Sequence, residues 1–500
     1  MSPHPPESAA PTRVDPVAVA ASEIIGGPLG RYAALARHTA RFGWQPAVAV
    51  LTGLSSLAVA LGVLQKGHCF TQGWRTPDQF WHACYSDLPV VYLSSNLGQE
   101  MPYLPGAHHL DQPLVSGVVM WLVGLAVPDG SAMMRQQWYF ALWAVLVTVI
   151  VMTLVAVTAA SLPRAPWLAA HLALSPVLVL ASMVSVDLLG VMLASVALWA
   201  WGRNKVALAG LMLGLAICAR TYPLVLLVAI GLLAVRSGRV GAWMRLAGTA
   251  LATSLAVSLP WLLVNGDGLL SAYRTWWHGG ASYGSVWMLP SVLKPTMSPG
   301  VLSSLLGSGL AAGAVTALAI VGWLVAVTVG AAFALSLDRR PTVAEVALVM
   351  LVIVVVTGKS MPVQAGLWLL PLIALVGLKW RDHLIWAGVE ATYFVGVWLY
   401  IAGLSQPDRG LPRRAYCLLI VLRVAAWLFV LVQVWRLARS RAPVSFAVDP
   451  EPVDAKPAEG EPLDVEPVDA ESFDWQQDEE VDPLAGPMAG APDQLLVRIT

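Results

Sequence analysis

Apolar stretches decide what this chain can fold into. Thirteen of them follow one another between residues 45 and 437. A soluble domain carries about 25% charged residues, whereas charged residues make up 12% of this chain and hydrophobic residues 57%. The sequence therefore predicts an all-α membrane protein that crosses the bilayer many times. The stretches fall at 45–64, 113–127, 138–160, 167–183, 187–202, 206–219, 222–235, 243–264, 311–336, 343–357, 365–378, 384–403 and 415–437.

Basic residues predict the orientation of these stretches. Arg clusters flank both the first and the last stretch, which places both ends of the chain in the cytoplasm. Thirteen is an odd number, so one stretch does not cross. We expect this to be 167–183, a short re-entrant or broken helix interrupted by Ser175-Pro176. The prediction is about 12 transmembrane helices with external loops at 66–112, 161–186, 265–310, 358–364 and 404–414.

The two ends of the chain differ from the middle. Residues 442–500 hold 15 of the 30 acids and two of the 30 bases, so the remaining residues carry a net charge of +13. We expect a cytoplasmic lead-in over 1–44, a transmembrane domain over 45–441, and a disordered, acidic, Pro-rich cytoplasmic tail over 442–500. The tail is either a solvated spacer or a binding segment for a cytoplasmic protein partner. Basic residues gather only in short loops, which argues against nucleic acid as a partner.

The polar loop 66–112 is the first candidate for chemistry. Asp87 lies in it within CYSDLPVVY, between two apolar stretches. A partly desolvated carboxylate there is suited to accept a proton from a hydroxyl group; the alternative is an ordinary helix cap or turn acid. Asp78, Glu100 and Asp111 compete for the role. The loop contains no Asp-x-Asp pair, so no metal site is evident, and we expect His108-His109 to face solvent.

Two of the four cysteines share this loop. A disulfide between Cys69 and Cys84 would stabilise the fold by roughly 3 kcal/mol in the chain-entropy model and would require an oxidising, extracytoplasmic side. The alternative is two free thiols. Cys218 and Cys417 fall inside apolar stretches and are expected to behave as small apolar residues.

Several motifs occur in the order found in one family. CYSDLPVVY, MPYLPG and DQPLVSGVVMW in the first loop resemble the first external loop of actinobacterial glycosyltransferase family 87 proteins, which belong to the GT-C class of polyprenyl-phosphate-sugar-dependent transferases. SVDLLGV, RTYPL, the segment 265–287, GKSMPVQAGLWLLP and an intramembrane Glu390 are similar to later motifs of the family. The resemblance covers about residues 45 to 437. Where neutral family residues have changed, as at Gly358 and Gln112, the neighbouring charges are kept.

The resemblance and the charge pattern select further site residues. Arg220 and Lys359 are expected at external ends of apolar stretches, where a lipid phosphate is a natural anionic partner. Asp187 lies at the same depth, and the alternative is an internal Asp187–Arg220 ion pair without a ligand. The predicted substrate-binding candidates are Asp111, Asp187, Tyr103, Arg274, His278, Trp287 and Gln364.

Two groups of these residues have ordinary alternatives. The aromatic residues of 265–287, Trp287 among them, either stack on sugar rings or form a belt at the bilayer interface. Glu390 and Arg423 lie inside apolar stretches and are expected to pair with each other.

The resemblance implies a GT-C-like membrane glycosyltransferase with a large first external loop. It implies transfer of a sugar, with mannose as the leading candidate, from a polyprenyl-phosphate donor to an envelope glycolipid or glycan acceptor. The transfer inverts the configuration of the sugar and takes place on the extracytoplasmic side of the cell membrane. Asp87 is the implied base, and no metal or other cofactor is expected. Two other classes stay open: a transporter or flippase of lipid-linked envelope precursors, and a non-catalytic scaffold of envelope assembly.

Overall fold

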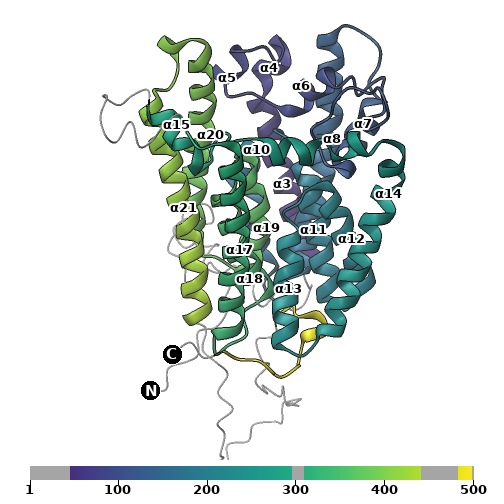
Figure 1. Cartoon of the computed structure of the whole chain (residues 1–500), viewed down its shortest axis with the longest axis vertical. Coiled ribbons are helices and arrows are strands. Elements are labelled where there is room, and N and C mark those ends of the chain that lie inside the picture. Colours follow the sequence, from purple (N-terminus) through teal and green to yellow (C-terminus); the bar gives the residue numbers. More distant parts are fainter. Residues whose placement is uncertain (1–44, 295–308, 441–481, 498–500) are drawn as a thin grey trace, which may run out of the picture.

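The computed structural model describes residues 45–294, 309–440 and 482–497, and in this part of the chain it contains helices and turns but no strands. Figure 1 shows the helices as one elongated bundle. Among the residues that the structure describes, six helices are long and apolar enough to cross a membrane. The chain is therefore an all-α polytopic membrane protein, as predicted. The six are α3 (Gln45–Gln65), α8 (Ala132–Ala160), α14 (Val240–His278), α17 (Ala312–Ser336), α20 (Trp380–Ser405) and α21 (Arg413–Ser440).

Shorter apolar helices fill the space between the long ones. They begin and end within a few residues of the predicted stretches, because Gly, Pro and charged residues punctuate the apolar pattern at both ends. α18 is the most completely buried of them, with twelve of its 14 residues inside the protein. They are α7 (Leu114–Gly124), α11 (Asp187–Gly202), α12 (Val206–Ala219), α13 (Leu224–Arg236), α18 (Val343–Val356) and α19 (Gly366–Val376).

The two ends of the bundle carry different structures. The upper end in Figure 1 holds the short helices of the first loop, α4 (Gly67–Gln72), α5 (Asp78–Trp81) and α6 (Asp87–Ser94), together with α15 (Leu289–Leu293). The lower end holds the C-terminal segment 482–497, drawn in yellow. We call these the loop end and the tail end. Every residue proposed below for chemistry lies at the loop end.

The prediction for which stretch does not cross is wrong. α7 stays at the loop end. Gly117 near its start packs closely against Tyr103, and Gly124 at its end packs closely against the carbonyl of Leu97, and both partners belong to the first loop. Apolar composition measures only how well a segment tolerates lipid or a protein interior, so it does not show that both ends of α7 lie at the same depth.

The stretch 167–183 runs between the two ends instead. It is broken into η2 (Pro166–Ala169), α9 (Ala170–Ala173) and α10 (Pro176–Ala181). Before it, the carbonyl of Ala160 accepts a hydrogen bond from Arg203 at the tail end, with an N–O distance of 3.5 Å. After it, the carbonyl of Val184 accepts from the backbone N–H of Asp87 at 2.7 Å. The predicted external loop 161–186 is therefore wrong, and its Arg164 joins the other basic residues at the tail end.

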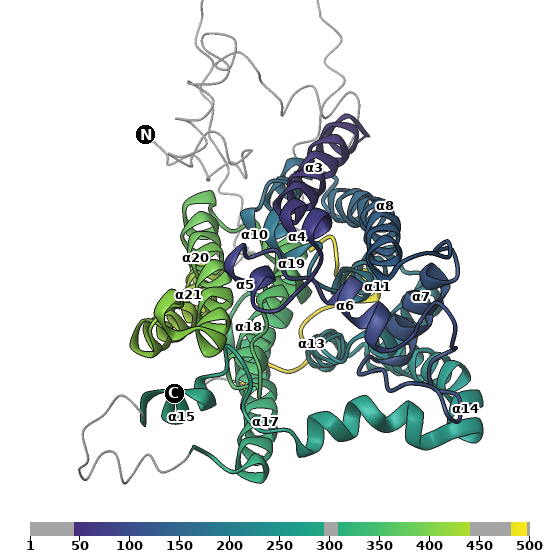
Figure 2. The same cartoon turned by 90° about the horizontal axis from the view of Figure 1, so that it is seen from above.

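α14 changes direction at Asn265, whose φ of −155° and ψ of 81° interrupt the helix. The part after the kink, 266–278, lies across the loop end and reaches toward α17 (Figure 2). There the hydroxyl of Thr316 donates a hydrogen bond to the carbonyl of Trp277 at 3.0 Å. The predicted external loop 265–310 thus begins as a helix, on which Tyr273, Trp276 and Trp277 are exposed. Residues 295–308 lie outside the described part.

The prediction of a disordered tail over 442–500 is wrong for residues 482–497. Asp493 forms ion pairs with Arg236 and Arg340, each with an N–O distance of 2.6 Å. Leu484 and Met488 are buried against the bundle. An acidic, Pro-rich composition suggests disorder, but here a single carboxylate meets two arginines, one at the end of α13 and one between α17 and α18. Residues 441–481 and the lead-in 1–44 lie outside the described part, so those predictions are untested.

Candidate active site

Asp87 begins α6 at the loop end and is held by the turn that precedes α11. The hydroxyl of Ser86 donates a hydrogen bond to the carbonyl of Met183 at 2.7 Å, and the N–H of Asp87 donates to the carbonyl of Val184 at 2.7 Å. The disulfide between Cys69 and Cys84 is present, with both cysteines buried. Asp87 is therefore anchored to the turn before α11 and lies three residues after a covalent crosslink.

The surroundings of Asp87 favour its protonated form. Burial raises the pKa of the carboxyl group, and the nearby charge of Asp187 adds to this. A hydrogen bond from the hydroxyl of Tyr85 to Oδ1 at 2.5 Å, together with the charges of Arg220 and Lys66, opposes the rise without cancelling it. The residue as a whole is half-buried. A carboxylate with a raised pKa is a stronger base than an ordinary aspartate.

Asp187 and Arg220 form the internal ion pair that the sequence left open. Nε and Nη2 of Arg220 both contact Oδ1 of Asp187, and the indole N–H of Trp368 donates to Oδ2 at 3.1 Å. Nη1 of Arg220 donates to the side-chain oxygen of Gln112 at 2.8 Å. A guanidinium group has five N–H donors, so these three contacts leave two N–H groups of Arg220 outside the bonds described.

Lys359 is engaged more completely than Arg220. Its ammonium group donates to the carbonyls of Trp276, Trp277 and Gly279 at 2.5, 3.0 and 2.9 Å, which end α14. An ammonium group has three donors, and these carbonyls are acceptors that a helix C-terminus leaves without an N–H partner inside the helix. Lys359 therefore caps the C-terminal end of α14 at the loop end. Its predicted role in binding a donor phosphate stays a prediction, and that role requires it to leave these carbonyls.

Two substrate-binding candidates of the first loop differ in exposure. Tyr103 is buried and adopts a positive φ of 67°, which is uncommon for a residue other than glycine. Its hydroxyl donates to the carbonyl of Gln112 at 2.8 Å, so it fixes the loop beside Arg220. Asp111 is exposed and lies 3.5 Å from Nε2 of His109.

The remaining candidates lie farther along the chain. Arg274 forms an exposed ion pair with Asp267 at 2.7 Å, and His278 is exposed at the end of α14. The indole N–H of Trp287 donates to the carbonyl of Thr357 at 2.9 Å. Gln364 lies half-buried in η5 (Val363–Ala365). The structure therefore gathers Asp87, Asp187 and Arg220, whereas their binding of substrate stays a prediction.

Glu390 and Arg423 pair with each other, as expected. Both carboxylate oxygens of Glu390 accept hydrogen bonds from Arg423 at 2.8 Å, and Oε1 also accepts from the indole N–H of Trp427 at 2.7 Å. Arg423 also donates to the carbonyls of Met361 and Pro362. The pair holds α20, α21 and the 361–362 turn together, which is a structural role.

Lys66 is the residue near the site that sequence reasoning missed. It follows α3 directly and is fully buried, with Nζ 3.4 Å from the carbonyl of Ala83 and 4.9 Å from the centre of the Phe394 ring. Burial lowers its pKa to about 7, against the opposing effect of Asp87. A lysine just after an apolar stretch normally marks the membrane edge, so the sequence offered no signal that Lys66 is buried inside the protein.

The fold and these contacts define a polytopic membrane protein with a carboxylate and a partly engaged arginine at one end of the bundle. The family model described as glycosyltransferase family 87 matches residues 112–358. This match confirms the resemblance seen in the sequence and places the chain in that family, as a glycosyltransferase. Asp187 and Arg220 lie inside the matched span, whereas Asp87 precedes it and Lys359 follows it directly. No curated protein and no solved structure matches the chain significantly.

Proposed function

We propose that this glycosyltransferase moves a sugar, with mannose as the leading candidate, from a polyprenyl-phosphate donor to a hydroxyl of an envelope glycolipid or glycan. The observation that carries the proposal is the position of Asp87 at the start of α6, near enough to Asp187 and Arg220 that the charges of both act on its carboxyl group. Asp87 as the base and Arg220 as a nearby cation suit a reaction in which a proton is removed while a phosphate leaves.

The proposed step balances as follows. Asp87 takes the proton of the acceptor hydroxyl, and the hydroxyl oxygen forms a bond to the anomeric carbon. The bond from that carbon to the phosphate oxygen breaks, and its electron pair stays on the departing polyprenyl phosphate. Attack opposite the leaving group inverts the anomeric configuration. The two N–H groups of Arg220 that its described contacts leave over would bind the phosphate without breaking the ion pair with Asp187.

The proposal places the loop end outside the cytoplasm. Arg203, Arg236 and Arg340 all lie at the tail end, together with Arg164. Basic residues concentrate on the cytoplasmic side of membrane proteins. The disulfide at the loop end fits the same assignment, because disulfides persist in oxidising compartments.

The test compares Asp87→Asn with the wild type, using purified protein, labelled polyprenyl-phosphate mannose or arabinose, and envelope lipid acceptors. We expect a loss of about 10²–10⁴ in rate, as for removal of a general base. Asp129→Asn, at an exposed acid between α7 and α8, is the matched control and should retain the wild-type rate. Full activity of a folded Asp87→Asn protein would refute the role of Asp87. Movement of lipid-linked precursors across vesicles without sugar transfer would support a transporter instead.

A further inference from the structure

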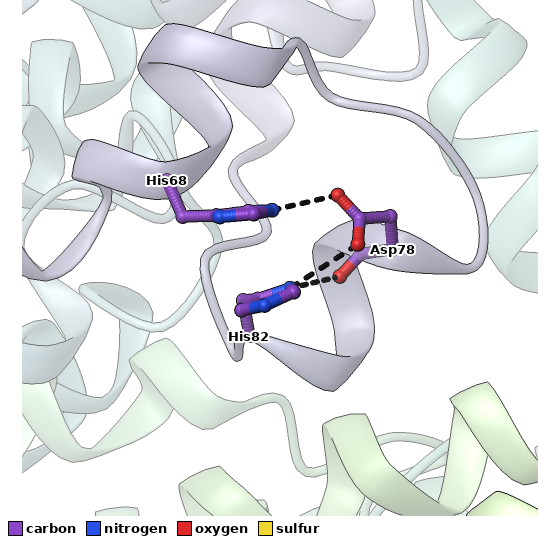
Figure 3. Close-up of side chains that lie close together, drawn as sticks. All are labelled: His68, Asp78 and His82. Atoms are coloured by element: carbon purple, nitrogen blue, oxygen red, sulfur yellow. Dashed lines mark hydrogen bonds and ion pairs between the residues drawn. The ribbon is translucent and has the colours of Figure 1, made fainter.

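Two histidines and one aspartate meet beside the Cys69–Cys84 disulfide, His68 directly before the loop that it closes and Asp78 and His82 within that loop. Nε2 of His68, on α4, lies 2.7 Å from Oδ2 of Asp78, the first residue of α5. Nδ1 of His82, which follows α5, lies 3.2 Å from Oδ1 of the same carboxylate. Figure 3 shows both rings directing a nitrogen at Asp78 from the same side.

The geometry of this cluster is close to that of a metal site. One ligand atom from each residue can be chosen so that all three lie within 4.8 Å of one another. Zinc binds histidine nitrogen and carboxylate oxygen at about 2.0–2.2 Å in a tetrahedral arrangement, which places ligand atoms about 3.3 Å apart. The side chains would have to rotate to bring all three atoms to one ion. The two rings stack, with centroids 3.5 Å apart and planes 16° apart, and each imidazole directs its lone pair within its own plane, so binding would splay the rings apart.

We propose that His68, Asp78 and His82 bind one divalent transition-metal ion, with zinc as the best fit. Two imidazole nitrogens and one carboxylate oxygen form a ligand set that suits zinc better than magnesium or calcium, which prefer oxygen ligands. The neighbouring cysteines are bonded to each other, so thiolate ligands are excluded. Three protein ligands leave the fourth tetrahedral position to water.

The side chains are accessible to an ion from solvent. His68, Asp78 and His82 are 35, 40 and 45% exposed. In the cluster as it stands, the carboxylate of Asp78 is hydrogen-bonded to Nε2 of His68, whereas Nδ1 of His82 is hydrogen-bonded to the backbone carbonyl of Asp78 at 3.1 Å and lies 3.2 Å from the carboxylate. An ion would replace these contacts with coordination by the two nitrogens and the carboxylate.

The position of the site indicates a structural role for the metal. The ion would join α4 to α5 beside the Cys69–Cys84 disulfide, and Cys84 precedes Asp87 by three residues. It would thus be a second crosslink in the loop that carries the proposed base. The sequence concealed the site because only Asp78 and His82 have helical i, i+4 spacing, whereas His68 reaches them through the folded loop.

The test uses the untagged full-length protein in detergent, treated with a chelator and then titrated with zinc chloride by calorimetry. We expect one zinc ion per chain. Asp78→Asn, which keeps the shape and a hydrogen-bond acceptor, and the double variant His68→Ala/His82→Ala should bind zinc about 100-fold more weakly or not at all, since loss of outer-shell partners alone costs 10–100-fold. His108→Ala is the matched control, because His108 forms a similar exposed pair with Glu100 at 2.8 Å.

Cobalt provides a second readout in the same proteins. A tetrahedral cobalt site has a strong visible absorption, which should appear in the wild type and in His108→Ala and be absent from Asp78→Asn. The proposal is overturned if the wild type takes up no stoichiometric metal, or if the His68→Ala/His82→Ala protein takes up as much as the wild type. Unchanged thermal stability of metal-free Asp78→Asn would show that its loss of binding does not arise from misfolding.

Discussion

The hydroxyl of Tyr85 donates a hydrogen bond to Oδ1 of Asp87 across 2.5 Å, although only Ser86 separates the two residues in the chain. This bond favours the ionised carboxylate, whereas burial, the largest influence, raises the pKa of Asp87. Tyr85 in turn stacks on Phe80 and contacts Trp398 of α20. The proposed base is thus oriented by a side chain that α20 holds in place.

Replacing Tyr85 by phenylalanine should move the pH dependence of transfer. A protonated Asp87 does not accept a proton, so the rate falls as the pH falls through its raised pKa. Without the hydrogen bond that pKa rises further, and we expect the acid limb of the pH–rate profile to shift upward by about one pH unit. Tyr283→Phe, in the loop that follows α14, should leave the pH–rate profile unchanged. Superimposable profiles for wild type and Tyr85→Phe would remove Tyr85 from the mechanism.

Lys66 should make stability depend on pH in the alkaline range. Burial lowers its pKa in the folded protein from 10.5 to about 7. Between these values the unfolded chain holds a proton that the folded chain lacks, so the free energy of unfolding rises with pH, by up to about 1.4 kcal/mol per pH unit. Lys66→Met should lose this slope in unfolding measurements at pH 7.5–9.5, whereas Lys205→Met, at an exposed lysine, should retain it. Equal slopes in Lys66→Met and wild type would contradict the prediction.

The ion pair of Asp187 and Arg220 should show strong coupling. Either Asp187→Asn or Arg220→Gln leaves one charge without its partner, and removing one partner of a buried pair costs about 3–5 kcal/mol. The double variant should be more stable than the sum of the single effects predicts, as measured by unfolding in a double-mutant cycle. If Arg220 also binds the donor phosphate, the double variant folds but transfers sugar slowly. A stable and fully active double variant would leave the pair a purely structural role.

The disulfide should be visible in the intact protein. Alkylation after denaturation without reductant should label Cys218 and Cys417 only, and mass spectrometry should find Cys69 and Cys84 in one linked peptide. Cys69→Ser/Cys84→Ser should lose about 3 kcal/mol of stability. Four labelled cysteines in unreduced protein would show that the bond does not form.

The C-terminal segment should stabilise the tail end. Arg236 is fully buried, and its ion pair with Asp493 spans 2.6 Å. Asp493→Asn should therefore lower the free energy of unfolding by about 2 kcal/mol, the scale of a hydrogen bond to a charged group. Asp408→Asn, at an exposed acid, should have little effect. Because the segment lies at the opposite end from Asp87, sugar transfer in vitro should survive in both variants.

Local sequence patterns were sufficient for much of the fold. The bounds of most helices, the break at Ser175-Pro176, the bond between Cys69 and Cys84 and the pair of Glu390 with Arg423 were all predicted. Each depends on a feature that the sequence displays directly: an apolar run, a proline, two cysteines in one loop, or opposite charges inside spans that need partners. The order of short motifs also identified the family.

Tertiary structure decided where these pieces lie relative to one another. It kept α7 at the loop end, sent the broken segment 166–181 between the two ends, and buried Lys66. It also brought Gln112 and Trp368 to the pair of Asp187 and Arg220, and it turned Lys359 onto the end of α14. Hydropathy reports the environment that a segment tolerates, whereas contacts between distant residues depend on which helix ends lie at the same position along the bundle axis. That position is set by the packing of the whole bundle, to which every helix contributes.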